Sequence, residues 1–177
     1  MPIALSRALF IGRFQPFHNG HLSALQEILQ SYGEAVMVIG SAQENLTEKN
    51  PLDTGERVSM IYAVLKARKI ESRVYVVPVP DTPESGLWPA RVLSYCPKVD
   101  AVFTGNDYVD MLFSRQGLKV LRQKLVAGVS ATAVRAKISA DDEGWANLVP
   151  SEVAEFLREK GLDERIRLLA NSGSSVG

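Results

Sequence analysis

Residues 8–29, ALFIGRFQPFHNGHLSALQEIL, join an apolar run, a loop with glycine and aromatic residues, and a stretch with helical periodicity. The run Ala8–Gly12 is nearly all apolar, which is typical of a strand covered on both faces of a parallel sheet. In Gly20–Ser31, apolar residues recur three and four positions apart, as on one face of a helix. The connection holds both histidines of the chain, His18 and His21. These residues therefore predict a strand–loop–helix unit that opens an α/β fold.

The same alternation of short apolar runs and longer helical patterns continues along the chain. The further candidate strands are 35–40, 73–79, 101–105 and, more weakly, 119–122. The further candidate helices are 55–68, 108–116 and 132–138. Right-handed crossovers between such strands predict a Rossmann-like open parallel sheet with helices on both faces.

The C-terminal region predicts one more helix and a tail. Residues 151–169 are amphipathic, with Ser151 as the expected N-cap. We expect one domain over residues 1–170, and the polar end NSGSSVG, residues 171–177, as a disordered tail.

The composition of the chain limits the classes of protein to which it can belong. The chain has 177 residues, 46% of them hydrophobic, and a formal net charge of zero, which argues against a broad nucleic-acid surface. Cys96 is the only cysteine, so no intrachain disulfide can form and a reducing cytoplasm is expected. The apolar start, residues 3–11, is interrupted by Ser6 and Arg7 and is too short to span a membrane. We therefore expect a cytoplasmic protein that binds neither nucleic acid nor membrane.

The loop between the first strand and the first helix is a predicted anion site. In an open α/β sheet, ligands bind outside the carboxyl ends of the strands. His18 and His21 are spaced to share one face of a helix start, where unpaired N–H groups and the helix dipole favour anions. Gly12 and Gly20 allow close approach of the backbone to a ligand, and Pro16 stiffens the loop.

Two plainer interpretations of the histidines stay open. Each could be an ordinary hydrogen-bonded residue at a helix start. His-x-x-His could also supply two metal ligands, although no cysteine or carboxylate cluster accompanies the pair. Neither interpretation accounts for the glycines together with Arg13 and Gln15.

The stretch GRFQPFHNGHL resembles the H-x-G-H signature of the nucleotidylyltransferase superfamily, and its longer form resembles the archaeal type of nicotinamide mononucleotide (NMN) adenylyltransferase. Six other stretches follow in the family's order: VIGSAQ (38–43), NPLDTGERVSMI (50–61), VYVVPVPD (74–81), GLW (86–88), VFTGND (102–107) and VSATAVR (129–135). The resemblance implies transfer of AMP from ATP to NMN, giving NAD and pyrophosphate by direct in-line attack. It also implies Mg²⁺ held by the phosphates with no metal ligand from the protein, and a homo-oligomer, commonly a hexamer.

Charge neutralisation on bridging phosphates is the main catalytic demand of such a transfer. The residues expected to meet it are His18, His21, Arg13, Lys49 and Arg135. The expected ATP-binding residues are Gly12, Phe14, Gln15, Gly20, Gly105, Asn106, Asp107, Ser130 and Thr132. The resemblance supplies the role of Lys49 and the adenosine neighbourhood at Gly105, Asn106 and Asp107. Taken alone, VSATAVR could be a helix N-cap with a surface arginine, and Asp107 could be a plain N-cap.

The resemblance places the acceptor at Ser41, Asp81, Ser85 and Trp88, with Trp88 stacked on the nicotinamide ring. An indole face attracts a cationic pyridinium, by ~0.5–2 kcal/mol. Without the resemblance, Trp88 could equally close the core under a proline-rich loop. Relatives often carry Asn at position 85 and Ala at position 86, which puts the carboxamide contacts in doubt.

Two other functions stay open. The same chemistry could serve another acceptor phosphate, against which Trp88 and GSAQ argue. The fold could also serve as a non-catalytic sensor of NAD or ATP, although a sensor would not need both histidines and the basic residues. A pyrophosphate-release assay across several acceptors separates these possibilities.

Overall fold

The computed structural model describes residues 6–124 and 126–173. Five strands form one parallel sheet in the order β3-β2-β1-β4-β5. The strands are β1 (Arg7–Gly12), β2 (Glu34–Ile39), β3 (Val74–Pro78), β4 (Ala101–Thr104) and β5 (Val120–Arg122). All five were predicted from the sequence, each to within one residue at either end. Their apolar runs are long enough to identify them because the central strands are buried on both faces.

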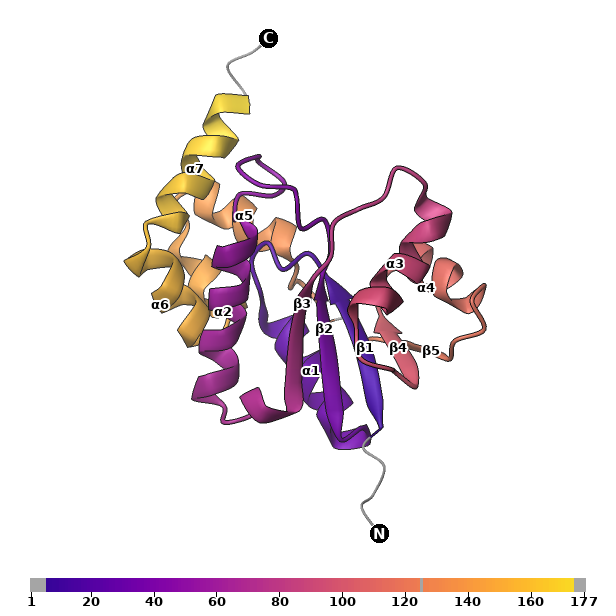
Figure 1. Ribbon diagram of the computed structural model, residues 1–177. Coiled ribbons are helices and arrows are strands. Elements are labelled where there is room, and N and C mark those ends of the chain that lie inside the picture. The colour runs from indigo at the N-terminus through magenta and orange to yellow at the C-terminus, as the bar shows by residue number, and fades with distance from the viewer. Residues whose placement is uncertain (1–5, 125, 174–177) are drawn as a thin grey trace.

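Seven α-helices connect or follow the strands within the described residues (Figure 1). They are α1 (Asn19–Ser31), α2 (Thr54–Ala67), α3 (Trp88–Tyr95), α4 (Asp107–Ser114), α5 (Ala131–Ser139), α6 (Ser151–Glu159) and α7 (Leu162–Gly173). Three short 3₁₀ helices are η1 (Glu71–Arg73), η2 (Ser85–Leu87) and η3 (Glu143–Leu148). Helix α3 was not predicted, because the prolines before it, Pro78, Pro80 and Pro83, indicate a loop. Pro89 is tolerated because it lies in the first turn, where its missing N–H has no helical partner to lose.

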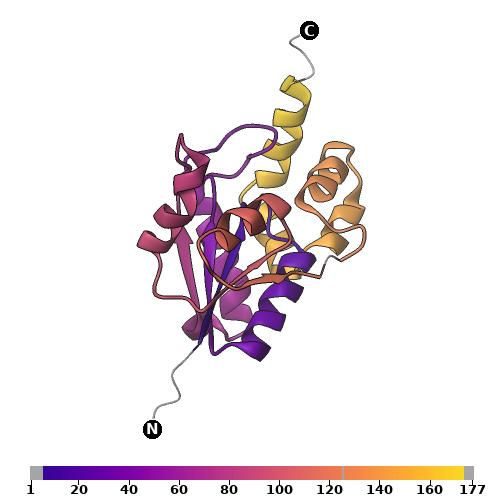
Figure 2. The same ribbon diagram turned by 90° about the vertical axis from the view of Figure 1, so that its right-hand side faces the viewer.

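Successive strand residues point to opposite faces of the sheet, and each face has its own core. Phe10, Met37 and Phe103 pack with α1, α2 and the C-terminal helices on one face. Leu9 and Val36 pack on the other face, under α3 and α4. Figures 1 and 2 show the resulting three layers, with α3 and α4 across the sheet from α1 and α2. The predicted Rossmann-like open parallel sheet with helices on both faces is confirmed.

The C-terminal region differs from the prediction in three details. The expected single helix 151–169 is two helices, because the chain turns at Gly161, whose φ of +63° suits glycine. Pro150 is the N-cap of α6, and Ser151 is the first helical residue. Helix α7 runs to Gly173, so residues 171–173 of the predicted tail are helical, and residues 174–177 lie outside the described range.

Strand order reverses at β1, since β2 and β3 lie on one side of it and β4 and β5 on the other. The carboxyl ends of β1 and β4 therefore flank the switch point at which open α/β sheets bind ligands. None of the described helices is long and apolar enough to cross a membrane.

Candidate active site

Two cavities open at the carboxyl edge of the sheet, and Arg13 lines both. The larger has a volume of about 290 Å³ and lies at the ends of β1, β2 and β4. The smaller has a volume of about 170 Å³ and lies between the loop after β1 and the start of α5. This edge is where the sequence placed the site.

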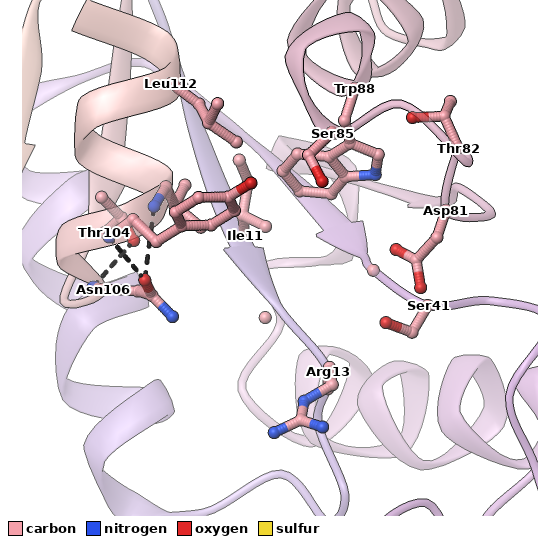
Figure 3. A pocket seen from close by; sticks show the side chains of 14 residues that line it. Ile11, Arg13, Ser41, Asp81, Thr82, Ser85, Trp88, Thr104, Asn106 and Leu112 are labelled. Atoms are coloured by element: carbon pink, nitrogen blue, oxygen red, sulfur yellow. Dashed lines mark hydrogen bonds between the residues drawn. The ribbon is translucent and has the colours of Figure 1, made fainter.

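The larger cavity has two facing sides (Figure 3). Trp88 and Ser85 lie on one side with Asp81 and Ser41, and Thr104, Asn106 and Leu112 lie on the other. All four predicted acceptor residues thus share a cavity with Asn106 and Gly12 of the predicted ATP set. Further lining residues, outside the predicted set of site residues, are Ile11, Gly40, Thr82, Thr104, Tyr108, Val109 and Leu112.

Trp88 lines the larger cavity and is the first residue of α3. The prolines near it had indicated that it would lie in a loop. Its ring meets that of Phe113 edge-on, with centroids 6.0 Å apart. The Nε1 atom is buried and has no hydrogen-bond partner among the described residues. A helix start and an aromatic neighbour hold the indole, which leaves part of its surface to the cavity.

The smaller cavity gathers three basic side chains from distant parts of the chain. Arg13, Lys49 and Arg135 line it together with His21 and Thr132, as the sequence predicted. Arg135 donates from Nη1 to the carbonyl of Gln15 at 2.8 Å, which aims its guanidinium at the loop after β1. Burial lowers the pKa of Arg135, and nearby Arg13 lowers it further. Mutually repelling cations held in one cavity favour a polyanionic ligand.

The two histidines form a stacked pair at the start of α1. Their ring centroids lie 3.6 Å apart with an interplanar angle of 21°. Gly20 makes room for this stack, because a Cβ there would lie 3.1 Å from Cε1 and Nδ1 of His18. Of the two rings, only that of His21 lines the smaller cavity, and His18 is its buried neighbour.

Burial keeps both rings neutral at pH 7. It lowers the pKa of His18 to about 4, and burial followed by the nearness of His18 lowers the pKa of His21 well below 6.5. The main-chain N–H of His18 donates to Nδ1 of His21 at 3.2 Å. Since Nδ1 is the acceptor, the proton of the neutral His21 ring is on Nε2. His21 can therefore donate one hydrogen bond from Nε2 without carrying a charge.

Several predicted ligand residues instead have structural contacts. Ser130 caps α5 by accepting from the N–H of Ala133 at 3.0 Å, and Asn106, not Asp107, caps α4. Asp107 forms an ion pair with Arg122 at 2.5 Å. The predicted residues that line neither cavity are His18, Gly20, Gly105, Asp107 and Ser130.

Gln15 and Phe14 line the smaller cavity, but most of each side chain is buried. Gln15 is 1% exposed, and its amide makes two hydrogen bonds with the main chain of Leu52, at 2.8 and 2.9 Å. Its side chain thereby fastens the loop after β1 to the segment before α2. The main-chain carbonyl of Gln15 accepts the hydrogen bond from Arg135.

Arg57 was not predicted as part of the site. Its side chain is 0% exposed and donates to the main chain of the loops after β1 and after β2, which both line the larger cavity. One arginine near a helix start gives no sequence signal of burial, although it lies within the stretch 50–61 that carries the resemblance.

Potential metal ligands do not cluster within the part of the chain that the structure describes. Over residues 6–124 and 126–173, no three His, Cys, Asp or Glu side chains are grouped so as to hold one. The smaller cavity has no acidic lining residue, and Asp81 is the acidic residue of the larger.

Comparison with known protein families finds one family model that matches this chain. The family model described as cytidylyltransferase-like matches residues 9–137, which is most of the chain. The chain therefore belongs to this family, a class of nucleotidyltransferases with an α/β fold.

Curated relatives identify the branch of the family. The chain is 43% identical over 94% of its length to the nicotinamide-nucleotide adenylyltransferase of Thermococcus onnurineus, covering 89% of that protein. It is 43% identical over 93% of its length to the protein of the same name from Ignicoccus hospitalis, covering 98% of it. Within the class, the chain belongs with the nicotinamide-nucleotide adenylyltransferases.

A solved structure shows the same fold at low sequence identity. A bifunctional NMN adenylyltransferase/ADP ribose pyrophosphatase from Francisella tularensis, complexed with AMP and a manganese ion, matches with a TM-score of 0.73 and 20% identity. The match covers 95% of this chain and 53% of the other, so this chain spans about half the length of that bifunctional protein.

Proposed function

We propose that this chain transfers the AMP group of ATP to the 5′-phosphate of NMN by direct in-line attack, with the residue roles given below. An oxygen of the NMN phosphate bonds to the α-phosphorus of ATP, the bond from that phosphorus to the bridging oxygen breaks, and pyrophosphate leaves. The observation that carries this proposal is that Arg13 lines both the larger cavity, which contains Trp88, and the smaller cavity, which contains the basic side chains. The reacting phosphates of two substrates would meet at such a shared wall.

The smaller cavity would hold the triphosphate. Arg13, Lys49 and Arg135 would neutralise the charge that grows on the departing pyrophosphate, at the N-terminal end of α5 where Thr132 and main-chain N–H groups add donors. In this reaction the protein contributes mainly positioning and charge stabilisation, which fixed cations provide.

His21 would act as a neutral hydrogen-bond donor to a phosphate oxygen through Nε2. His18 would hold the His21 ring in place by stacking against it. Truncating His21 to Ala should lower kcat by ~10²-fold, with smaller effects on substrate binding, because the lost donor acts on transition-state charge. A covalent adenylyl-histidine trapped during turnover would contradict this role, since in-line transfer requires no enzyme-bound intermediate.

The larger cavity would hold the nicotinamide riboside portion beside Trp88, with Asp81, Ser85 and Ser41 as polar neighbours. Asn106 across the cavity would contact the adenosine portion of ATP. A cationic ring that carries a carboxamide can bind to an aromatic face and to a polar rim, and this cavity offers both.

A divalent ion, Mg²⁺ in this proposal, would enter with ATP and offset phosphate charge. The residues present fit that arrangement, because they supply cations and neutral donors around the phosphates and leave metal ligation to phosphate oxygens and water.

The test is pyrophosphate release from ATP and Mg²⁺ with a panel of acceptors: NMN, nicotinic acid mononucleotide, phosphopantetheine, FMN and glycerol phosphate. We expect NMN to give the highest kcat/KM. Preference for a non-pyridine acceptor would replace the proposed substrate, and tight NAD or ATP binding without pyrophosphate release from any acceptor would favour a sensor.

Two wider properties belong to the same proposal. By resemblance the chain assembles as a homo-oligomer, a hexamer, in the cytoplasm. Light scattering coupled to size exclusion would measure the mass, and a monomer mass at micromolar concentration would contradict the assembly.

A further inference from the structure

Arg57 is a completely buried cation whose partners are all neutral oxygens. Its guanidinium donates to six main-chain carbonyls and one hydroxyl, at distances of 3.1 to 3.4 Å. The acceptors are the carbonyls of Asp53, Arg13, Gly40, Ser41, Ala42 and Glu44, and Oγ1 of Thr54.

Five of these seven acceptors come from two strand-end loops that line the cavities, and the other two, on Asp53 and Thr54, lie at the start of α2 itself. The carbonyl of Arg13 follows β1, and the carbonyls of residues 40, 41, 42 and 44 follow β2. Arg13 lines both cavities, and Gly40 and Ser41 line the larger one. The Arg57 side chain on α2 therefore connects the backbone of Arg13, which lines both cavities, to the backbone of residues 40 and 41, which line the larger cavity.

Stability alone does not account for an arginine in this place. Burying a guanidinium costs several kcal/mol of solvation, and well-packed apolar residues often match buried charged groups in stability. The planar guanidinium offers five N–H donors in a fixed fork, which lets it bind several carbonyls at once. An ammonium group has three donors on a flexible stem and cannot span both loops in the same way.

We infer that Arg57 is a positioning residue for the transfer reaction, which sets the distance between the two substrate cavities by fixing the backbone of Arg13 and of residues 40–44. Its side chain lines neither cavity, so it would act through Arg13 and Ser41. In-line transfer depends on alignment, and a displacement of about 1 Å can cost ~10²-fold in rate. The choice of substrates in the test rests on the proposed function.

Arg73 provides a matched control. It also donates to three main-chain carbonyls, those of Gly33, Leu29 and Tyr32, at 2.7 to 3.2 Å. It lies just before β3, at the amino edge of the parallel sheet and away from both cavities. Arg57→Lys and Arg73→Lys therefore remove the same kind of interaction at opposite ends of the sheet.

The first measurement is steady-state kinetics below the melting temperature of each variant. We expect Arg57→Lys to lower kcat at saturating ATP and NMN by at least ~30-fold, and Arg73→Lys to change kcat by less than about twofold while lowering Tm. Wild-type kcat and KM in Arg57→Lys, with a lowered Tm like that of Arg73→Lys, would overturn the inference. An inactive wild-type protein would count against the proposed function instead.

The second measurement needs no turnover. Amide hydrogen exchange of residues 13 and 40–44 should be faster in Arg57→Lys than in the wild type, and unchanged in Arg73→Lys. Unchanged exchange there would also overturn the inference. If Arg57→Lys does not fold, Thr54→Val serves instead, since Thr54 Oγ1 accepts from Arg57 and donates to the carbonyl of Ala42. It should give a smaller loss of kcat in the same direction, and wild-type kcat in it would contradict the inference.

Discussion

His18 and His21 are held so close that protonating both rings would place two positive charges in a buried stack. Their centroids are 3.6 Å apart, and His18 is 8% exposed. The free protein avoids this repulsion by keeping both rings neutral at pH 7. A sequence shows that two histidines can share a face, but their charge state depends on burial, which the fold determines.

Acidification should destabilise the fold through these residues. His18 titrates near 6.5 in the unfolded chain and at about 4 in the folded one, so the unfolded state binds more protons between these values. The free energy of unfolding therefore falls as the pH falls through this window, by on the order of 3 kcal/mol for His18 once the pH is below it. His21 contributes with the same sign.

Urea unfolding at pH 7 and pH 4.5 measures this effect, with His18→Asn as the comparison. Asparagine is a good N-cap residue that does not titrate. We expect the loss of stability between the two pH values to be smaller in the variant than in the wild type. An equal loss in both proteins would show that carboxylates, which both share, account for the acid sensitivity.

Trp88 should determine the affinity for the acceptor. Trp88→Ala removes the aromatic face of the larger cavity, and we expect KM for NMN to rise about tenfold or more while KM for ATP stays nearly unchanged. Trp145→Phe is the control, because Trp145 is 1% exposed in the core of the opposite face. It should lower Tm and leave KM for NMN unchanged. An unchanged KM for NMN in Trp88→Ala would remove Trp88 from the acceptor site.

At the scale of elements, helix α5 presents one basic side chain to the site and another to solvent. Arg135 lines the smaller cavity, whereas Lys137 pairs with Asp142 on the outside at 2.5 Å. We expect Arg135→Ala to lower kcat/KM for ATP by at least ~10-fold and Lys137→Ala to leave it within about twofold. Lys49→Ala should lie between them, because Lys49 is on an exposed loop. Equal effects of Arg135→Ala and Lys137→Ala would contradict a specific role for Arg135.

The elements also show what the sequence can predict. Strands were found because burial on both faces requires continuous apolar runs. The structure brings Arg13, Lys49 and Arg135 to one cavity, and for Lys49 the sequence signal was the resemblance. Helix α3 was missed because proline in a first turn has the same local signal as proline in a loop. The hydrogen bonds from Arg57 to two loops could not be predicted, because main-chain carbonyl acceptors leave no signal in the sequence of side chains.

At the scale of the whole molecule, the C-terminal helices complete the core on one face of the sheet. Leu162 and Ile166 of α7 pack in the same cluster as Phe10 of β1 and Val134 of α5. Arg165 also binds Glu56 at 2.7 Å, near the start of α2, the helix that carries Arg57. The elements that line the smaller cavity are therefore packed into one core with α7.

This packing predicts that α7 unfolds together with the sheet rather than separately. Leu162 is 1% exposed, so Leu162→Ala should lower the free energy of unfolding by about 2–4 kcal/mol through lost burial and a cavity. Leu168 on the same helix is 67% exposed, and Leu168→Ala should change stability by less than about 0.5 kcal/mol. Urea unfolding followed by far-ultraviolet circular dichroism and by tryptophan fluorescence should give one coincident transition in each protein. A separate early transition in the circular dichroism of Leu162→Ala, with the fluorescence transition of Trp88 in α3 and Trp145 in η3 left at its wild-type midpoint, would show that α7 is an independent unit.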